Sequence, residues 1–350
     1  MEPNGSLRFG FEIPAHPGDD GREPYRLAYE TCQLAEELGF DFGFLPHHRF
    51  TAGFPSAPLI VLAAIASRTS ALRVGTGIFL LPTHHPLDVA EQIAQLDEVS
   101  GGRVIFTAGL GYRPYEFEPL GLPFAARGSL MEEGLEVLRL VLSQEDASYA
   151  GNHYAFEHVT VHPRPTQRPR PPVWVGANRR VAVERAARLA DGWFADFMQT
   201  GASLAPTIAI YREIAAQQLG GSSTLCLMRH VHVAATQREV EEGWLPGVQA
   251  FYRDVWEGGS RWPDPEGTMP RLLAGEALGL REFAHDRLIA GTPDDCIEAI
   301  TRLHAVTGCD SLFVGLRAGT GSHARGAGAV EDTREQLRRF GQEVIPAFRP

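Results

Sequence analysis

The chain has 350 residues, of which 44% are hydrophobic, and a formal net charge of −11 with both signs spread along the sequence. This length suits one large α/β domain with a sizeable core. The acidic balance excludes a basic surface for nucleic acid and a polybasic membrane anchor.

Cysteine usage and apolar runs bear on the compartment. The four cysteines are far apart, with neither CxxC spacing nor a dense framework, as is typical of reduced thiols. Residues 1–10 lack the order of a secretory signal, and no apolar run approaches the length of a membrane span. We therefore expect a soluble, cytoplasmic protein that has no membrane partner.

Apolar runs of strand length recur along the whole chain. Six are plain, and two weaker ones, at 193–197 and 225–234, bring the total to eight. In chain order the predicted strands are Leu7–Ile13, Phe40–Leu45, Leu72–Leu81, Arg103–Leu110, Val173–Ala177, Trp193–Phe197, Leu225–Ala234 and Leu312–Leu316.

Stretches with helical period separate these strands. One has a stripe of apolar residues that ends at Gly39, and another opens with Pro86 and ends at Gly101. Alternating strands and helices predict parallel pairing. Eight strands favour a closed (β/α)8 TIM barrel, and the absence of GxGxxG after the first strand weakens an open dinucleotide-binding sheet.

Two stretches interrupt the alternation. Residues 148–172 interleave Tyr and His and end rich in proline, and a second interruption runs from Gly258 to about residue 285, with Gly, Pro and charge concentrated in 258–270. Both are predicted to be loop insertions at the barrel mouth. No repeat or linker requires a second domain, so residues 1–350 are predicted to form one.

Residues that follow the strands are the candidate site residues, because barrel active sites lie at the carboxyl ends of the strands. Histidine pairs occur at two such exits, His47–His48 and His84–His85. Histidine suits acid–base chemistry and metal binding, although a loop histidine can also serve only backbone hydrogen bonds. Neither of these pairs has HxH or HExxH spacing and no acidic residue flanks them, so we expect no metal at these exits.

Glycines and one helix start suggest a planar, phosphorylated ligand. Gly77 and Gly109 have no side chain, so a flat ring could lie close to the backbone near the barrel mouth. The alternative is that these glycines serve only tight turns. Asn178 is a good helix N-cap, followed by Arg179 and Arg180. A helix start with arginines is a natural phosphate seat, whereas the alternative is an ordinary capped helix.

Taken together, several segments resemble the luciferase-like monooxygenase family in order and spacing over nearly the whole chain. The segments that carry the resemblance are Gly39–Asp41 through Pro46–Thr51, Arg73–Gly77 through Leu81–Pro86, Leu96–Arg103, Tyr149–Tyr154, Pro163–Pro165, Pro172–Val175, Leu189–Trp193, Gly291–Asp295 and Phe340–Pro346. The resemblance implies a (β/α)8 barrel that binds reduced FMN or, in one branch, a deazaflavin with the ring in the mouth.

The resemblance also implies roles for single residues. His48, Glu116 and His47 are the candidate catalytic residues, although many members carry an acidic residue where this chain has His47. The candidate cofactor-binding residues are Thr76, Gly77, Ile78, Gly109, Leu110, Gly176, Ala177, Asn178 and Arg179, with the family's non-prolyl cis peptide expected at Gly77–Ile78. The candidate substrate-pocket residues, by position, are Arg49, Tyr112, Trp193 and Phe194.

The function implied is a flavin-dependent monooxygenase that uses reduced FMN and O2 to oxidise a small organic substrate. A separate flavin reductase would supply the FMN, and a homodimer is compatible with the resemblance. The main alternative is a hydride-transfer enzyme that uses the deazaflavin coenzyme F-420. A metal-dependent hydrolase built on the four exit histidines and a non-catalytic flavin-binding protein are further alternatives, and no motif names the substrate.

Overall fold

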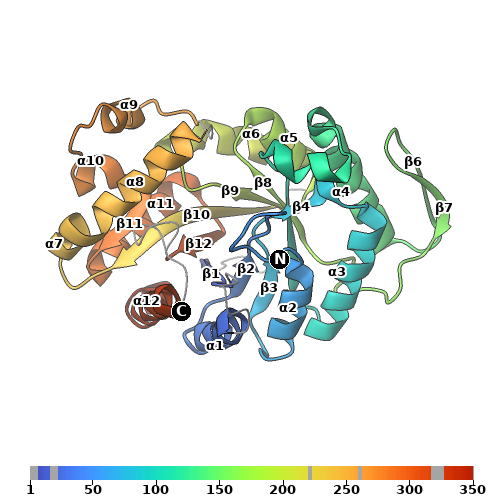
Figure 1. Ribbon diagram of the computed structural model, residues 1–350, viewed down its shortest axis with the longest axis horizontal. Coiled ribbons are helices and arrows are strands. Elements are labelled where there is room, and N and C mark those ends of the chain that lie inside the picture. Colours follow the sequence, from blue (N-terminus) through green and yellow to red (C-terminus); the bar gives the residue numbers. More distant parts are fainter. Residues whose placement is uncertain (1–6, 16–22, 220–222, 259–261, 317–326, 350) are drawn as a thin grey trace.

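The computed structural model describes residues 7–15, 23–219, 223–258, 262–316 and 327–349. Within them eight parallel strands close into a barrel in the order β1, β2, β3, β5, β8, β9, β10, β12 and back to β1. Their bounds are β1 Arg8–Glu12, β2 Phe42–Leu45, β3 Arg73–Thr76, β5 Val104–Gly109, β8 Val173–Ala177, β9 Gly192–Ala195, β10 Thr224–Val233 and β12 Ser311–Gly315. The (β/α)8 TIM barrel predicted from the sequence is confirmed (Figure 1).

Helices surround the barrel on its outer side (Figure 1). The α-helices are α1 Glu23–Glu37, α2 Pro58–Ala66, α3 Pro86–Ser100, α4 Arg127–Ser143, α5 Arg180–Leu189, α6 Gly201–Leu219, α7 Gln237–Glu239, α8 Leu245–Glu257, α9 Thr268–Leu273, α10 Leu280–Ala284, α11 Pro293–Thr307 and α12 Ala327–Arg339. None of them has both the length and the apolar composition to cross a membrane.

Local sequence signals explain where α3 and α11 begin and end. In α3, Pro86 occupies the first turn, the His85 side chain accepts a hydrogen bond from the Leu87 backbone N–H, and Gly101 ends the helix at a φ of 68°. In α11, Thr292 and Asp295 form a capping box, since each side chain accepts from the other residue's backbone N–H. These helices therefore position the strand exits that precede them.

The strands are buried on both faces, as their continuous apolar runs predict. Side chains that point into the barrel form one cluster, and its buried members are Phe42, Phe44, Ile105, Trp174, Phe194, Cys226 and Phe313. Side chains on the outer faces pack against the helices in the main core. The lumen is thus filled, and chemistry must take place above it, where the strands end. The four cysteines, Cys32, Cys226, Cys296 and Cys309, are free and buried.

All eight predicted strands are present, with two differences. The run 72–81 forms β3 and then a separate strand, β4 (Phe79–Leu80), which pairs with β5. A further strand, β11 (Leu288–Gly291), was not predicted and pairs with the end of β10. Four residues are too few for a reliable periodic signal, and β11 forms because β10 extends beyond the barrel.

The first insertion is a hairpin and does not cover the barrel mouth as expected. Strands β6 (Ala147–Ala150) and β7 (Ala155–Val159) pair antiparallel and project beside α4 at the right of Figure 1. The Tyr149 hydroxyl donates to Glu136 at 2.6 Å, and the backbone N–H groups of Asn152 and His153 donate to Glu133 at 3.0 and 2.8 Å. These two carboxylates on α4 therefore hold the hairpin against the outside of that helix.

The second insertion contains α9 and α10 and packs on α8. A separate apolar cluster joins it to the exits of β9 and β10, with Met198, Tyr252, Trp262, Met269 and Phe283 among its buried members. Arg287 and Asp264 form an ion pair at 3.1 Å whose side chains are 1% and 4% exposed. This insertion is therefore part of the wall above the β9 and β10 side of the barrel.

Candidate active site

The exits of three adjacent strands bring the predicted catalytic pair together. β3 lies between β2 and β5 in the barrel, His48 follows β2, and Glu116 lies in the loop that follows β5. Nδ1 of His48 is 2.8 Å from Oε1 of Glu116. The sequence separates these residues by 68 positions, and the barrel closes that distance across the end of β3.

Glu116 is completely buried, and its two oxygens differ. Oε1 also accepts a hydrogen bond from the Arg49 backbone N–H at 3.1 Å, whereas buried Oε2 has no partner among the described residues. An ionised carboxylate only accepts hydrogen bonds, so His48 carries a proton on Nδ1 and donates it. Nε2 of His48 is then the nitrogen available to exchange a proton with a bound molecule.

Aromatic rings surround His48 on its accessible side. The Phe54 ring lies 4.6 Å and the Tyr112 ring 6.0 Å from the imidazole, both nearly perpendicular to it. The His48 side chain is 15% exposed, and Tyr112 is 56% exposed. Tyr112, predicted to line the substrate pocket, therefore stands at the rim beside His48.

His47 does not share the environment of its neighbour. Its Nδ1 accepts a hydrogen bond from the Leu80 backbone N–H at 3.2 Å, and its ring packs on Phe79 and His84. Burial lowers the pKa of His47 to about 3, with a further contribution from the neighbouring His84. His47 is therefore neutral and joins the β2 exit to β4, which is a structural role and not the catalytic role predicted from the sequence.

Arg49, predicted to contact substrate, is engaged within the protein. Its guanidinium donates to the Thr83 carbonyl at 3.2 Å and to Nε2 of His84 at 3.1 Å. Burial, followed by the charge of Arg49, lowers the pKa of His84 to about 4. The side chain of Arg49 thus fixes the loop after β4, while its backbone helps to orient Glu116.

The Gly77–Ile78 peptide bond is cis, as the resemblance implied. The Ile78 side chain occupies the space that two glycines leave free. A Cβ on Gly109 would overlap Ile78, and one on Gly176 would lie 2.7 Å from its Cγ2. These glycines therefore accommodate Ile78, while Gly77 and Ile78 are themselves only partly buried at the end of β3.

Three more predicted cofactor residues make contacts within the protein. The Thr76 hydroxyl donates to the Thr107 carbonyl at 2.9 Å and accepts from the Thr107 N–H, so this side chain links β3 to β5. Leu110 packs, partly buried, against the main core. The Ala177 carbonyl accepts from Nε1 of Trp193 at 2.8 Å.

The helix start that was predicted to bind phosphate, at α5, has a different N-cap residue from the one predicted. The N-cap residue of α5 is Arg179 and not Asn178, and Arg179 makes no side-chain capping bond. The side chain of Asn178 instead acts on the carboxyl group of Asp196, the residue that follows β9, and lowers its pKa against the larger rise that burial causes. Asn178 and Arg179 are both exposed at the start of a ten-residue helix, so the free amides of α5 still form an anion-binding geometry.

The two remaining pocket predictions have different outcomes. Trp193 is completely buried on the outer face of β9, where it packs on Tyr211 at 5.3 Å. It cannot line the mouth, because residues alternate in direction along a strand. Phe194 points inward and is 6% exposed, next to Phe313 at 5.2 Å, so it forms the floor beneath the mouth.

Sequence reasoning missed polar residues on the β9 and β10 side. Asp196 follows β9 directly, and burial raises the pKa of its carboxyl group, while the neighbouring Arg229 opposes that rise. Arg229 is fully buried and donates to the Asp196 carbonyl at 3.1 Å, and His230 follows it on β10. The signal was present, because an arginine and a histidine inside an apolar strand need a structural reason.

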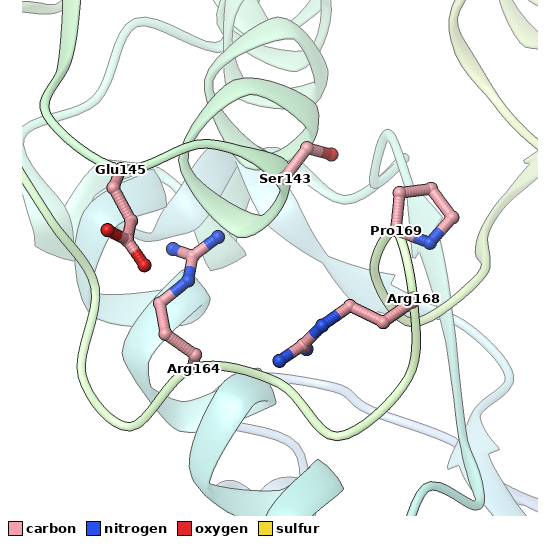
Figure 2. A pocket seen from close by; sticks show the side chains of 5 residues that line it. All are labelled: Ser143, Glu145, Arg164, Arg168 and Pro169. Carbon is pink, nitrogen blue, oxygen red and sulfur yellow. The ribbon is translucent and has the colours of Figure 1, made fainter.

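Two described cavities lie at the other end of the barrel. The first, of about 330 Å³, is lined by Ser143, Glu145, Arg164, Arg168 and Pro169 (Figure 2). A second, of about 350 Å³, adjoins it at Arg168 and Pro169. Arg164 donates to the Val141 and Leu142 carbonyls in the last turn of α4. This is the amino-terminal end of the strands, which in such barrels serves stability, so we assign the chemistry to the His48 end.

Comparison with known proteins decides the family. A family model described as luciferase-like monooxygenase matches residues 7–309. The chain belongs to the luciferase-like monooxygenase family. Among the described residues of this luciferase-like chain, no group of three or more His, Cys, Asp or Glu side chains could hold a metal ion.

Two relatives match the luciferase-like chain over different lengths. It is 26% identical to an FMNH(2)-dependent dimethylsulfone monooxygenase from Pseudomonas putida, over 98% of this chain and 95% of that protein. An uncharacterized protein from Sinorhizobium fredii is 35% identical, but the match spans only about half of either protein (51% and 54%).

Among solved structures, monooxygenase RslO1 from Streptomyces bottropensis superposes with a TM-score of 0.77 at 25% identity, covering 98% of this chain and 100% of that one. A coenzyme F420-dependent tetrahydromethanopterin reductase from Methanopyrus kandleri has a TM-score of 0.74 at 22% identity, with the same coverage. The second likeness shows a shared fold.

Proposed function

We propose that this protein is a flavin-dependent monooxygenase that uses reduced FMN and O2 to oxidise a small organic substrate. The observation that carries the proposal is the His48–Glu116 pair, which spans the end of β3 where Gly77 and Ile78 present their backbone. A proton-exchanging nitrogen beside a flat backbone surface suits chemistry on a ring bound in the mouth.

The residues present fit reduced FMN at both of its ends. The buried Oε2 of Glu116 has no partner among the described residues, and the backbone of residues 77–78 would hold the ring at the end of β3. The α5 amides with exposed Arg179 suit the phosphate. Bound reduced FMN would supply the electrons that activate O2. The relative named as FMNH(2)-dependent supports this choice and implies a separate flavin reductase as supplier.

Each protein group then has a defined task. Glu116 holds Nδ1 of His48 protonated and fixes the ring orientation, so Nε2 faces the bound molecules. His48 moves a proton at Nε2, and the surrounding Phe54 and Tyr112 rings restrict water. Substrate would enter beside Tyr112 and rest above Phe194.

The alternative is hydride transfer with a reduced deazaflavin, which the F420-dependent reductase of the same fold supports. Anaerobic titration of the purified protein with reduced FMN and with reduced deazaflavin, each followed by an oxygen pulse, separates the two. We expect tight FMN binding and an oxygen-dependent absorbance transient. Tight deazaflavin binding with no such transient would replace the monooxygenase by a hydride transferase.

A further inference from the structure

His230 stands at the barrel mouth opposite the His48–Glu116 pair. On β10 the inward positions include Cys226 and Met228, which belong to the cluster in the lumen, and His230 is the next inward position. β10 lies across the barrel from β3, since three strands separate them in either direction. A Cβ on Gly315 would lie 2.8 Å from the His230 ring, so this glycine leaves room for the imidazole over the end of β12.

Aromatic rings from two other elements enclose His230. The ring of Phe197, which follows β9, lies 4.4 Å away, and the rings of Phe251 and Tyr252 on α8 lie 5.2 and 5.7 Å away. Phe197 and Phe251 are only partly buried, and their ring centroids are 5.6 Å apart. An aromatic surface with one polar ring at its centre therefore borders this side of the mouth.

The wall that carries these rings is held by buried polar contacts. Tyr252 donates its hydroxyl to the Phe197 carbonyl at 2.8 Å. Arg287 donates to the Met198 carbonyl at 3.0 Å and pairs with Asp264 on the second insertion. The loop after β9 is thus fixed at Phe197 and at Met198, which pre-organises the surface for a ligand.

His230 is itself 5% exposed, and its buried Nδ1 has no hydrogen-bond partner among the described residues. Burial lowers the pKa of His230 to about 3 even though Glu12 on β1 opposes the change. A neutral imidazole offers one acceptor and one donor nitrogen. Buried polar atoms normally have partners, so this ring is suited to a ligand that supplies one.

We propose that Phe197, His230 and Phe251 form a substrate subsite for an uncharged aromatic compound with a hydroxyl group, as in a phenol. The aromatic ring packs against Phe197 and Phe251, and the hydroxyl donates a hydrogen bond to the unprotonated nitrogen of His230. The carboxylate of Glu12, which faces His230 from β1, disfavours an anionic ligand. This inference rests on the proposed function, because it names the substrate class of the same mouth.

Calorimetric titration of the full chain without flavin tests the subsite with three probes that share one ring system: 2-naphthol, 2-methoxynaphthalene and 2-naphthoate. We expect 2-naphthol to bind about fivefold more tightly than 2-methoxynaphthalene, since one neutral hydrogen bond separates them, and 2-naphthoate to bind most weakly. Equal affinities for the first two, a preference for 2-naphthoate, or no binding of 2-naphthol at millimolar concentration overturns the proposal.

Single substitutions test whether His230 is the residue that makes 2-naphthol bind more tightly than 2-methoxynaphthalene. His230→Phe keeps a ring but removes both nitrogens, and it should abolish the fivefold difference, whereas His230→Gln restores part of it. Phe197→Leu should weaken 2-naphthol and 2-methoxynaphthalene by the same factor. His232→Phe is the matched control, since this histidine lies two residues along β10 and stacks on Trp244 at 5.2 Å. A preference that survives in His230→Phe places the hydrogen bond elsewhere and overturns the assignment.

The flavin experiment stays separate from this one. Loss of the 2-naphthol preference with an intact oxygen-dependent transient removes the subsite and keeps the monooxygenase. An intact preference without any transient removes the proposed function and keeps the subsite.

Discussion

The two sides of the barrel mouth each present a histidine, and their surroundings give the two rings different properties. On the β2 and β5 side, His48 donates to a buried carboxylate and is 15% exposed beside the rim. On the β9 and β10 side, His230 lies among aromatic rings, and burial keeps it neutral even though the charge of Glu12 opposes the change in its pKa. One side is thus equipped to move a proton and the other to recognise a neutral group.

The comparison extends to the adjacent histidine. His47 is next to His48 in sequence, yet its ring points into the core and accepts from the Leu80 backbone. Consecutive residues that leave a strand point in opposite directions, and a single carboxylate, Glu116, lies on only one side. Two adjacent histidines therefore differ in chemistry because only one of them lies next to a carboxylate.

The largest expected effect is a loss of turnover when the imidazole ring of His48 is removed. His48→Ala should lower FMN-dependent turnover, on any substrate that the wild type oxidises, by about 100-fold or more, the usual contribution of a general acid–base group. Stopped-flow absorbance after an oxygen pulse measures the accompanying change in lifetime of the transient. His47→Asn is the matched neighbour and should keep the wild-type rate. Unchanged turnover and lifetime in His48→Ala would remove His48 from the mechanism.

A smaller effect, on stability, is expected from the buried ion pair between Arg287 and Asp264 on the β9 and β10 side. Asp264→Asn leaves Arg287 as a buried charge without its carboxylate, which should lower the free energy of unfolding by about 3 kcal/mol. Chemical denaturation followed by tryptophan fluorescence measures this loss. The exposed pair Arg271–Glu276 on the same insertion provides the control, and Glu276→Gln should leave stability unchanged. Equal effects of the two substitutions would mean that the buried pair does not stabilise the wall.

The smallest effect concerns His47 and its pH dependence. The pKa of His47 is lowered to about 3 in the folded protein from an ordinary value of 6.5. Above pH 6.5 both states are neutral at this residue, whereas below it the unfolded chain takes up a proton that the folded chain refuses. This residue therefore lowers the free energy of unfolding by up to about 1.4 kcal/mol per pH unit as the pH falls.

His47→Asn should remove that share of the slope, because an amide oxygen can accept from the Leu80 N–H without titrating. Urea denaturation between about pH 5 and 7 gives the slopes. His158→Asn serves as control, since the His158 side chain is 76% exposed, and it should keep the wild-type slope. A steeper slope in His47→Asn would contradict the buried, neutral ring.

Much of the architecture was predictable from the chain. The eight barrel strands, the ends of α3 at Pro86 and Gly101 and the cis peptide at Gly77–Ile78 all follow from periodicity, caps or family resemblance. Strand β11 was not predicted, because it is short and depends on the excess length of β10. The hairpin β6–β7 was expected over the mouth, but acceptors on α4 hold it against the outside of the barrel.

The sequence predicted which residues form the central pair of the site, but it did not predict the direction in which some of the other side chains point. His48 and Glu116 were named from the sequence, and the structure brings them within 2.8 Å. Trp193 was misplaced, because the direction of a side chain depends on strand register, which a short apolar run does not reveal. Asn178 was expected to cap α5, but the helix begins one residue later and Arg179 occupies the N-cap position.

The sequence by itself determined the succession of strands and helices and the residues that leave each strand, because hydrophobic period and helix caps are local properties. Only the tertiary structure decided which histidine meets Glu116, which ring is left neutral among aromatic side chains, and which arginine is buried with a partner. Those outcomes depend on contacts between residues far apart in the chain, and burial and neighbouring charge, which set the pKa of a side chain, exist only after the barrel has closed.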